Sequence, residues 1–169
     1  VYGKTLKDAA KWAKTINCET ISKINEKVDP LYARDFIQTC ETKHNNMLAE
    51  LGEMIQKDIE NIRLIAIAGP SSSGKTTFSN RLRIELMSRG IFPVTLSIDN
   101  YYIDRDKILP NEDGEIDLED INTIDIELFN QHLLALINGE TVDMPIFDFN
   151  VAKRTHYKKV SIPKNVPIV

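Results

Sequence analysis

The sequence predicts an α/β fold in which a parallel sheet follows a helical N-terminal segment. Apolar residues recur at helical spacing through residues 30–62. A continuous apolar run at residues 64–68 then leads through a glycine-rich turn into an amphipathic stretch, the order typical of a buried parallel strand and its helix. A second short apolar run at 94–98 predicts another strand. We therefore expect a helical extension over residues 1–62 and an α/β part over residues 63–169.

The composition is that of a globular protein and narrows the classes of function. The chain has 169 residues, of which 42% are hydrophobic and 27% charged, with a net charge of -4. An acidic chain is a poor match for a nucleic-acid surface, so we expect no nucleic-acid partner. No apolar run approaches the roughly 18 residues that a membrane helix needs, so we expect no membrane partner. Cys18 and Cys40 form no metal-like pair and suit the reducing cytoplasm, which is the expected location.

Two capping signals organise the helical extension. Thr5 and Asp8 fit a capping box ahead of a short amphipathic helix that runs to about residue 16. Asp29 followed by Pro30 predicts a second helix start, because a capping carboxylate precedes a proline in the first turn. The apolar stripe that follows predicts one long helix or two in tandem, packed on a partner.

Helix and strand signals continue through the α/β part. Residues 76–89 predict a helix with Phe78, Leu82 and Leu86 on one face, and Gly90 marks its end.

The second half of the α/β part contains weaker signals. Residues 103–124 are acidic and predict a loop, after which Asp125 caps a helix that Gly139 ends. Residues 140–160 are mixed and fit either a hairpin or a loop. The apolar tail at 165–169 predicts the opening of another buried strand.

The stretch from Gly69 to Thr76, GPSSSGKT, matches the phosphate-loop pattern G-x-x-x-x-G-K-[ST] at every fixed position. Gly69 and Gly74 allow the backbone to curl its N–H groups around phosphates at the positive end of a helix. Lys75 can reach the β- and γ-phosphates, and the Thr76 hydroxyl can coordinate Mg²⁺. The fold class is therefore a P-loop NTPase-type parallel sheet, incomplete in this chain, with ATP and Mg²⁺ as expected cofactors. The expected cofactor-binding residues are Gly69, Ser71, Ser72, Ser73, Gly74, Lys75, Thr76 and Thr77.

Asp99 ends the second predicted strand. Ligands of open α/β sheets bind beyond the carboxyl ends of the strands, so Asp99 is expected to face the same crevice as the phosphate loop. A carboxylate there can accept a proton from an attacking hydroxyl or order magnesium-bound water. The alternative is a turn aspartate that caps local backbone. We expect Asp99 and Lys75 to be catalytic, and Thr76 and Asp99 to hold the metal.

These residues resemble the phosphoribulokinase/uridine kinase family of P-loop kinases over roughly residues 63–169. The resemblance rests on the phosphate loop, on Asp99-Asn100-Tyr101-Tyr102 and on Pro145-Ile146-Phe147-Asp148-Phe149. It implies that Asp99 is the catalytic base for a ribose 5′-hydroxyl. The substrate-binding residues that it implies are Tyr102, Glu119, Phe147, Phe149 and Arg154.

The chain departs from the family pattern at two positions. Ala152 stands where uridine kinases usually carry a histidine that contacts the pyrimidine, and Glu119 stands where the family often has a ribose-binding aspartate. The identity of the acceptor therefore stays open. The helical stretch 34–55 ahead of the kinase module looks like bacterial nucleoside kinase-like proteins, which are longer and carry a region similar to part of threonyl-tRNA synthetase.

The expected function is an ATP-dependent small-molecule kinase of the uridine kinase type, with a nucleoside as acceptor. A kinase for another acceptor, such as a sugar phosphate or pantothenate, is the first alternative. A nucleotide-binding regulatory protein is the second, although the Asn-Lys-x-Asp motif of GTP-binding switches is absent. The family's lid arginines come later in sequence, so we expect this chain alone to be inactive. It is either part of a longer protein or a chain whose sheet another copy completes, as a homo-oligomer.

Overall fold

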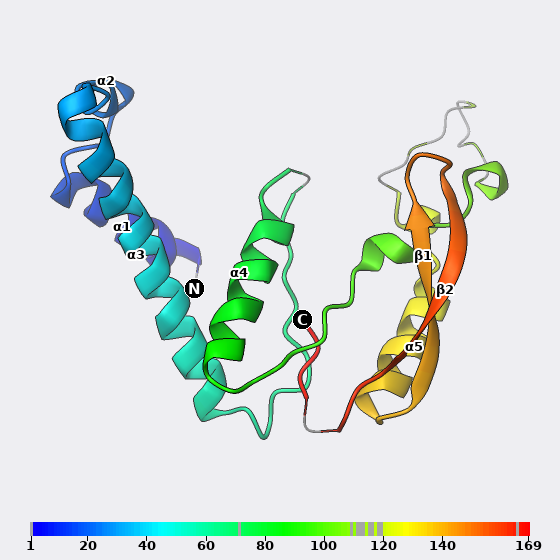
Figure 1. Cartoon of the computed structure of the whole chain (residues 1–169). Coiled ribbons are helices and arrows are strands. Elements are labelled where there is room, and N and C mark those ends of the chain that lie inside the picture. Colours follow the sequence, from blue (N-terminus) through cyan, green and yellow to red (C-terminus); the bar gives the residue numbers. More distant parts are fainter. Residues whose placement is uncertain are drawn as a thin grey trace. The chain divides into compact units, whose positions relative to one another are not determined.

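The computed structural model describes residues 2–70, 72–108, 110, 114, 117, 120–164 and 166–169. The chain divides into two compact units, residues 1–50 and residues 51–169 (Figure 1). Each unit is described by itself. The first unit is helical and the second contains helices and strands, as the fold class predicted.

The first unit consists of α1 (Tyr2–Thr15), α2 (Ile21–Asn25) and most of α3 (Pro30–Lys57), which continues into the second unit. Asp29 caps α3 as predicted, because its Oδ1 accepts a hydrogen bond of 2.8 Å from the N–H of Leu31. The expected apolar stretch forms one continuous helix of 28 residues rather than two in tandem.

Some helix boundaries differ from those expected. Helix α1 already begins at Tyr2, ahead of the capping box expected at Thr5. Helix α3 ends at Lys57, several residues before the expected end. Helix α2 was not anticipated, because its 5 residues are too few to show an apolar period. Its N-cap is Thr20, whose side chain accepts from the N–H of Lys23.

Two earlier segments of the second unit pair with the tail of the chain through isolated parallel bridges. Leu64 and Val94 each form a parallel bridge with Ile168. The carbonyl of Ile168 accepts a 2.8 Å hydrogen bond from the N–H of Ile65. Segment 166–169 therefore lies between segments 64–68 and 94–98, in the parallel order expected, although these described residues form isolated bridges and not the full strands predicted.

Helix α4 (Lys75–Ser88) begins directly after the phosphate loop. Leu82 and Leu86 are 1% and 0% exposed, as expected for the apolar face of this helix. The other side of α4 approaches the last turns of α3. A Cβ atom at Gly52 would lie 2.8 Å from Cγ of Glu85 and 2.9 Å from Nε of Arg89, so a larger residue would require these side chains to shift.

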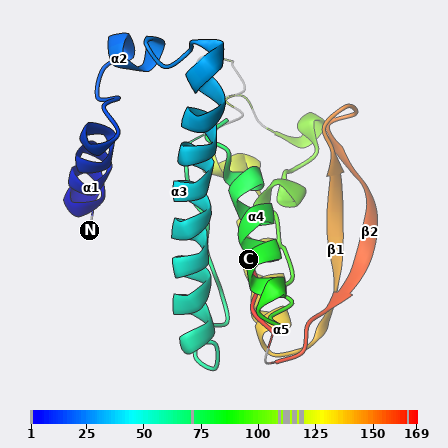
Figure 2. The ribbon, with the colours of Figure 1, turned by 60° about the vertical axis from the view of Figure 1, so that its left-hand side comes forward.

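Residues 140–160, which the sequence left open as either a hairpin or a loop, form a hairpin (Figure 2). Its strands are β1 (Thr141–Asp148) and β2 (Lys153–Ser161), which pair antiparallel. A register shift falls between Ile146 and Phe147, and it places Phe147 opposite Arg154. Such an irregularity bends the strand and redirects the side chains beyond it.

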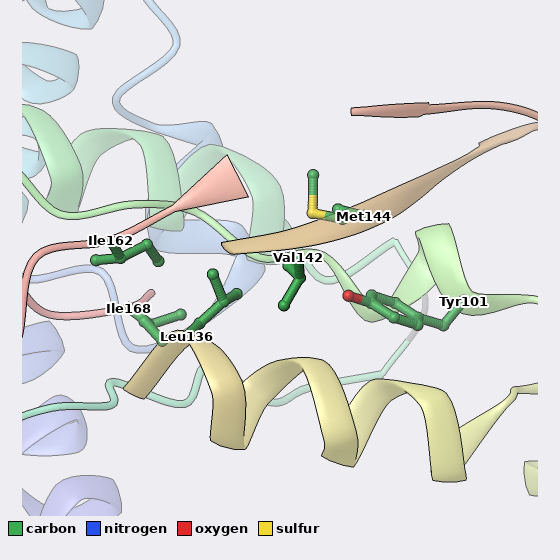
Figure 3. Close-up of a cluster of buried hydrophobic side chains, with 6 residues drawn as sticks. All are labelled: Tyr101, Leu136, Val142, Met144, Ile162 and Ile168. Carbon is green, nitrogen blue, oxygen red and sulfur yellow. The ribbon is translucent and has the colours of Figure 1, made fainter. Parts of the chain in front are cut away.

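A hydrophobic core joins the hairpin to α5 (Ile126–Ile137) and to the sheet. Asp125 caps α5 as predicted, with its Oδ1 accepting from the N–H of Leu128 at 3.0 Å. Figure 3 shows that Val142 of β1 and Leu136 of α5 point toward one another in the space between these two elements. The buried members of the core are Tyr101, Leu136, Val142, Met144, Ile162 and Ile168.

Two backbone hydrogen bonds join the two ends of the loop predicted ahead of α5. The N–H of Ile103 donates to the carbonyl of Thr123 at 2.8 Å, and the N–H of Asp125 donates to the carbonyl of Tyr101 at 2.8 Å. These bonds hold the base of the loop against the start of α5. The described part of this region contains the short 3₁₀ helices η1 (Ile98–Tyr101), η2 (Arg105–Lys107) and η3 (Ile121–Thr123).

Candidate active site

The phosphate loop curls because two of its residues adopt left-handed backbone conformations. Ser72 has a φ of 57° and Gly74 a φ of 84°. Gly74 is also the N-cap of α4, and it offers no side chain to the N–H groups of the first turn. Those N–H groups and the positive end of the helix are therefore directed into the loop, which is the arrangement that binds phosphate.

The ammonium group of Lys75 lies inside the curve of this loop. Its Nζ donates to the carbonyl oxygens of Gly69 at 2.8 Å and Pro70 at 2.7 Å. Gly69 is needed for this close packing, because a Cβ atom there would lie 2.9 Å from Oγ of Ser73. The structure thus gathers the glycines and the lysine of the motif into one cradle.

The remaining predicted loop residues surround this cradle. Ser72, Ser73, Thr76 and Thr77 are exposed, while Ser71 lies outside the described residues. The cradle has the N–H donors, the cation and the hydroxyl that a magnesium-bound triphosphate requires, so the residues present fit ATP. Their individual roles in binding stay predictions.

No group of three or more metal-binding side chains occurs among the described residues of the chain. Magnesium at nucleotide sites takes few protein ligands, because phosphate oxygens and water complete its shell. The hydroxyl of Thr76 and the carboxylate of Asp99 fit such a sparse set in chemical type. Metal binding by these two residues remains a prediction.

Asp99 lies on η1, at the end of the strand that contains Val94. The N–H of Asp99 donates to Oγ of Ser97 at 3.3 Å, and the residue is exposed. The strand of Val94 and the strand of Leu64 both run parallel to segment 166–169. The carboxyl ends of these two segments therefore point to the same edge, and a shared position of Asp99 and the phosphate loop at that edge stays a prediction.

Three of the predicted acceptor residues come together in an aromatic cluster of Tyr102, Phe147 and Phe149. The ring centroids are 5.6 Å apart between Tyr102 and Phe147, 6.0 Å between Tyr102 and Phe149, and 5.0 Å between the two phenylalanines. Phe149 is 66% exposed, so the cluster reaches the surface. Asn100 ties the two segments together, because its Oδ1 accepts from the N–H of Phe147 at 3.3 Å. Glu119, the remaining expected acceptor residue near this loop, lies outside the described residues.

Arg154, the fifth predicted acceptor residue, is turned toward the backbone behind this cluster. Its Nε donates to the carbonyl of Tyr102 at 3.0 Å and its Nη2 to the carbonyl of Tyr101 at 2.8 Å. Its Nη1 lies 3.1 Å from Oδ2 of Asp125, and the Arg154 side chain is 15% exposed. A direct contact with the acceptor stays a prediction for this residue.

A further set of contacts holds the chain after Tyr102 against the tip of the hairpin. Oδ1 of Asp104 accepts from the backbone N–H of Arg154 at 2.9 Å, and Oδ2 accepts from Nζ of Lys107 at 2.9 Å. These hydrogen bonds, with the first as the larger cause, lower the pKa of the Asp104 carboxyl. The N–H of Arg105 donates to the carbonyl of Ala152, whose φ is 53°.

Sequence reasoning missed Asn100, Asp104 and Asp125 as partners of the acceptor region. Asp125 was identified only as a helix cap, and Asn100 and Asp104 only as parts of longer segments. Their partners lie tens of residues away along the chain, so local spacing contains no signal for these contacts. The register of the hairpin, which sets them, becomes visible only in the structure.

The strand, the glycine-bounded loop and α4 together define a P-loop nucleotide-binding fold. The chain belongs to the phosphoribulokinase/uridine kinase family, whose model matches residues 64–169. This is a family of kinases, so membership supports phosphotransfer with a nucleotide as donor.

Curated relatives and a solved structure agree with this assignment. A uridine kinase of Aliivibrio fischeri (strain MJ11) is 33% identical over 110 residues, covering 63% of this chain and 50% of that protein. Uridine-cytidine kinase C of Dictyostelium discoideum is 28% identical over 110 residues, covering 65% of this chain and 22% of that protein. The chain thus spans half or less of these relatives. A crystal structure of a protein described as a fructose transport system kinase, from Silicibacter sp. TM1040, matches the fold with a TM-score of 0.58 at 24% identity, covering 72% of this chain and 60% of that one.

Across the described part of the chain, none of the helices is both long enough and apolar enough to cross a membrane.

Proposed function

We propose that this chain is the nucleotide-binding portion of an ATP-dependent kinase that phosphorylates the 5′-hydroxyl of a nucleoside. The observation that carries the proposal is the parallel bridging of Leu64 and Val94 to Ile168. These bridges support the placement of the phosphate loop and Asp99 at one shared edge. A donor cradle beside a carboxylate is the pairing that phosphoryl transfer to a hydroxyl needs.

Each group has a distinct part in this proposal. Bound ATP with Mg²⁺ supplies the γ-phosphoryl group and leaves as ADP when the bond to the β-phosphate breaks. Lys75 and the N–H groups of the loop hold the phosphates and balance their charge. Asp99 accepts the proton of the acceptor hydroxyl while the hydroxyl oxygen forms its bond to the γ-phosphorus. Thr76 and Asp99 would hold the metal ion.

The aromatic cluster supports a planar acceptor. Tyr102, Phe147 and Phe149 offer apolar ring faces and edges, which pack well against a nucleobase. Within this proposal Glu119 contacts the ribose. Tyr102 of this cluster lies shortly beyond Asp99 in the same chain segment, so we expect one molecule to contact both.

One observation favours a different acceptor, and it keeps the second candidate open. Ala152 presents only a methyl group at the position where the family's histidine contacts the pyrimidine. Its carbonyl already accepts the N–H of Arg105 at 3.1 Å. Ala152 therefore cannot supply the side-chain contact that the histidine makes to the base. A sugar phosphate or pantothenate accordingly belongs among the acceptors to be tested.

The experiment measures ADP release by the longest natural chain that contains these residues, with ATP and Mg²⁺. The acceptor panel consists of uridine, cytidine, adenosine, guanosine, a sugar phosphate and pantothenate. Release stimulated by a nucleoside supports the proposal, and release stimulated only by another acceptor supports the second candidate. Slow hydrolysis that no acceptor stimulates would instead indicate a regulatory nucleotide-binding protein.

The proposal extends to location and assembly. We infer a cytoplasmic enzyme, because ATP and free nucleosides are available there and both cysteines, Cys18 and Cys40, are unpaired thiols. Homo-oligomer formation and the inactivity of residues 1–169 alone stay predictions.

A further inference from the structure

We propose that Arg154 is a positioning residue, which holds the acceptor site together through backbone and carboxylate contacts rather than by touching the acceptor. The inference rests on the proposed function, and it assigns Arg154 a role different from the substrate contact expected from sequence. It follows from where the three nitrogen atoms of the guanidinium group lie.

The guanidinium group joins three separate elements. Nε and Nη2 donate to the carbonyl oxygens of Tyr102 and Tyr101, at 3.0 Å and 2.8 Å. Nη1 lies 3.1 Å from Oδ2 of Asp125, the residue that caps α5. Arg154 itself is on β2, so one side chain connects the hairpin, the end of η1 and the start of α5. A planar group with donors in a fixed fork suits this task, whereas a lysine offers a single centre.

These contacts position Asp99 and Tyr102, the two residues that meet the acceptor in the proposed function. Tyr101 is the last residue of the 3₁₀ turn that contains Asp99, and Tyr102 is its C-cap, so fixing their carbonyls fixes the end of that turn. The ring of Tyr102 contacts that of Phe147, which pairs with Arg154 across the hairpin. Arg154 therefore sets the position of Tyr102 relative to Phe147 and to the proposed base.

The environment of Arg154 argues against a direct contact with the acceptor. Its side chain is only 15% exposed, and each of its three nitrogen atoms already has a partner in the protein. Its backbone N–H is also engaged, by Oδ1 of Asp104 at 2.9 Å. Moving the guanidinium to the acceptor would break two hydrogen bonds to backbone carbonyls and one ion pair, which is costly in a partly buried site.

The first test compares Arg154→Lys with Asp125→Asn in the longest natural chain. An asparagine still caps α5 but loses the charge that pairs with Arg154. Both variants are expected to raise the KM for the acceptor, by about 10- to 100-fold for Arg154→Lys. The KM for ATP stays within about twofold, because the phosphate loop is unaffected. The double variant is expected to be little worse than Arg154→Lys alone, since both changes disrupt one contact.

Two results would overturn the inference. An unchanged acceptor KM in Asp125→Asn, together with a large increase in Arg154→Lys, would mean that Arg154 contacts the acceptor itself. An unchanged acceptor KM in both variants would mean that Arg154 does not organise the site. The matched control is Lys153→Ala, which removes a neighbouring exposed cation paired with Asp106 and should leave both KM values unchanged.

A second measurement does not depend on activity. Amide hydrogen exchange in Arg154→Lys should become faster at Ile103 and Asp125, whose N–H groups close the base of the loop beside Arg154. Exchange at Phe78 in α4 should not change. If the wild type releases no acceptor-dependent ADP, the proposed function fails, while faster exchange at these two amides still supports the organising role. Unchanged exchange there would contradict it.

Discussion

The phenol oxygen of Tyr101 lies 3.1 Å from Nδ1 of His132, and the two rings meet edge to face with centroids 5.7 Å apart. Tyr101 is 0% exposed, and burial raises its pKa to about 12. The hydroxyl therefore keeps its proton at neutral pH and forms a hydrogen bond with the imidazole. This bond connects the segment that follows Asp99 to α5, beneath the proposed acceptor site.

Tyr101→Phe should lower the free energy of unfolding by about 0.5–1.5 kcal/mol, because the ring packing survives while the hydrogen bond is lost. Urea denaturation followed by circular dichroism measures this change. Tyr157→Phe is the matched control, since Tyr157 is 57% exposed and should unfold as the wild type does. Equal stability of the Tyr101 variant and the wild type would mean that water replaces the bond at no cost.

The stability of the second unit should fall as the pH drops below about 6.5, the ordinary pKa of histidine. Burial lowers the folded-state pKa of His132, against the opposing charges of Asp143 and Asp125. Below the ordinary value the unfolded chain binds more protons than the folded chain, so acid favours unfolding. Urea midpoints between about pH 7.5 and pH 5.5 would measure the slope.

His132→Gln should make that slope smaller, whereas His156→Gln, at an exposed position, should leave it as in the wild type. A slope that is the same in all three proteins would assign the pH dependence to other groups.

Lys75→Ala should weaken ATP binding by about 10- to 100-fold, because a charge-assisted contact to phosphate contributes about 1.5–3 kcal/mol. The Lys75 side chain faces the loop rather than the core, so the fold should persist. Calorimetric titration with ATP and Mg²⁺ gives the affinity, and circular dichroism checks the fold. Lys164→Ala, a lysine remote from the loop in sequence, serves as the control. Equal affinity in Lys75→Ala and the wild type would remove Lys75 from the phosphate site.

A comparison of two glycines with similar backbone angles separates an effect on fold stability from an effect on ATP binding. Gly74 and Gly90 have φ values of 84° and 79°, and neither has an atom within 4 Å of an added Cβ. Alanine at either position should therefore destabilise the fold by about 1–2 kcal/mol through backbone strain alone. Only Gly74→Ala should also weaken ATP binding, because Gly74 shapes the loop. Equal affinities in the two variants would show that the curl at Gly74 is not needed for the ligand.

Asp99→Asn should leave ATP binding nearly intact and slow phosphoryl transfer by roughly 10²–10⁴-fold, the usual contribution of a general base. Single-turnover measurements on the longest natural chain separate transfer from binding. Asp106→Asn, an exposed carboxylate on η2, is the control. Transfer within about threefold of the wild type would give Asp99 a structural role as the turn aspartate.

The local parts of the fold and site could be predicted from the sequence. The phosphate loop, the Asp125 cap and the inward face of α4 each depend on residues within one or two turns of one another. Contacts between distant segments could not be predicted in this way. The pairing of Arg154 with Asp125 and of Asn100 with Phe147 depends on the hairpin register. A shift by one residue would turn Arg154 to the other face of the hairpin.

The aromatic cluster shows how a resemblance and a structure contribute differently. Family motifs identified Tyr102, Phe147 and Phe149 one by one, and the structure showed that their rings touch. The same motifs gave Arg154 a comparable role. Only the direction of its guanidinium group, toward carbonyls and a carboxylate, separates it from the other three.

The position of segment 166–169 between the two earlier strands has a consequence for how the protein is made. Leu64 and Val94 both pair with Ile168, so neither strand can find this partner until the ribosome has released the last of these residues. The pairing of Leu64 with Ile168 joins residues about a hundred positions apart, and such long-range pairing is intrinsically slow. During synthesis the apolar strand ahead of the phosphate loop remains unpaired and open to aggregation.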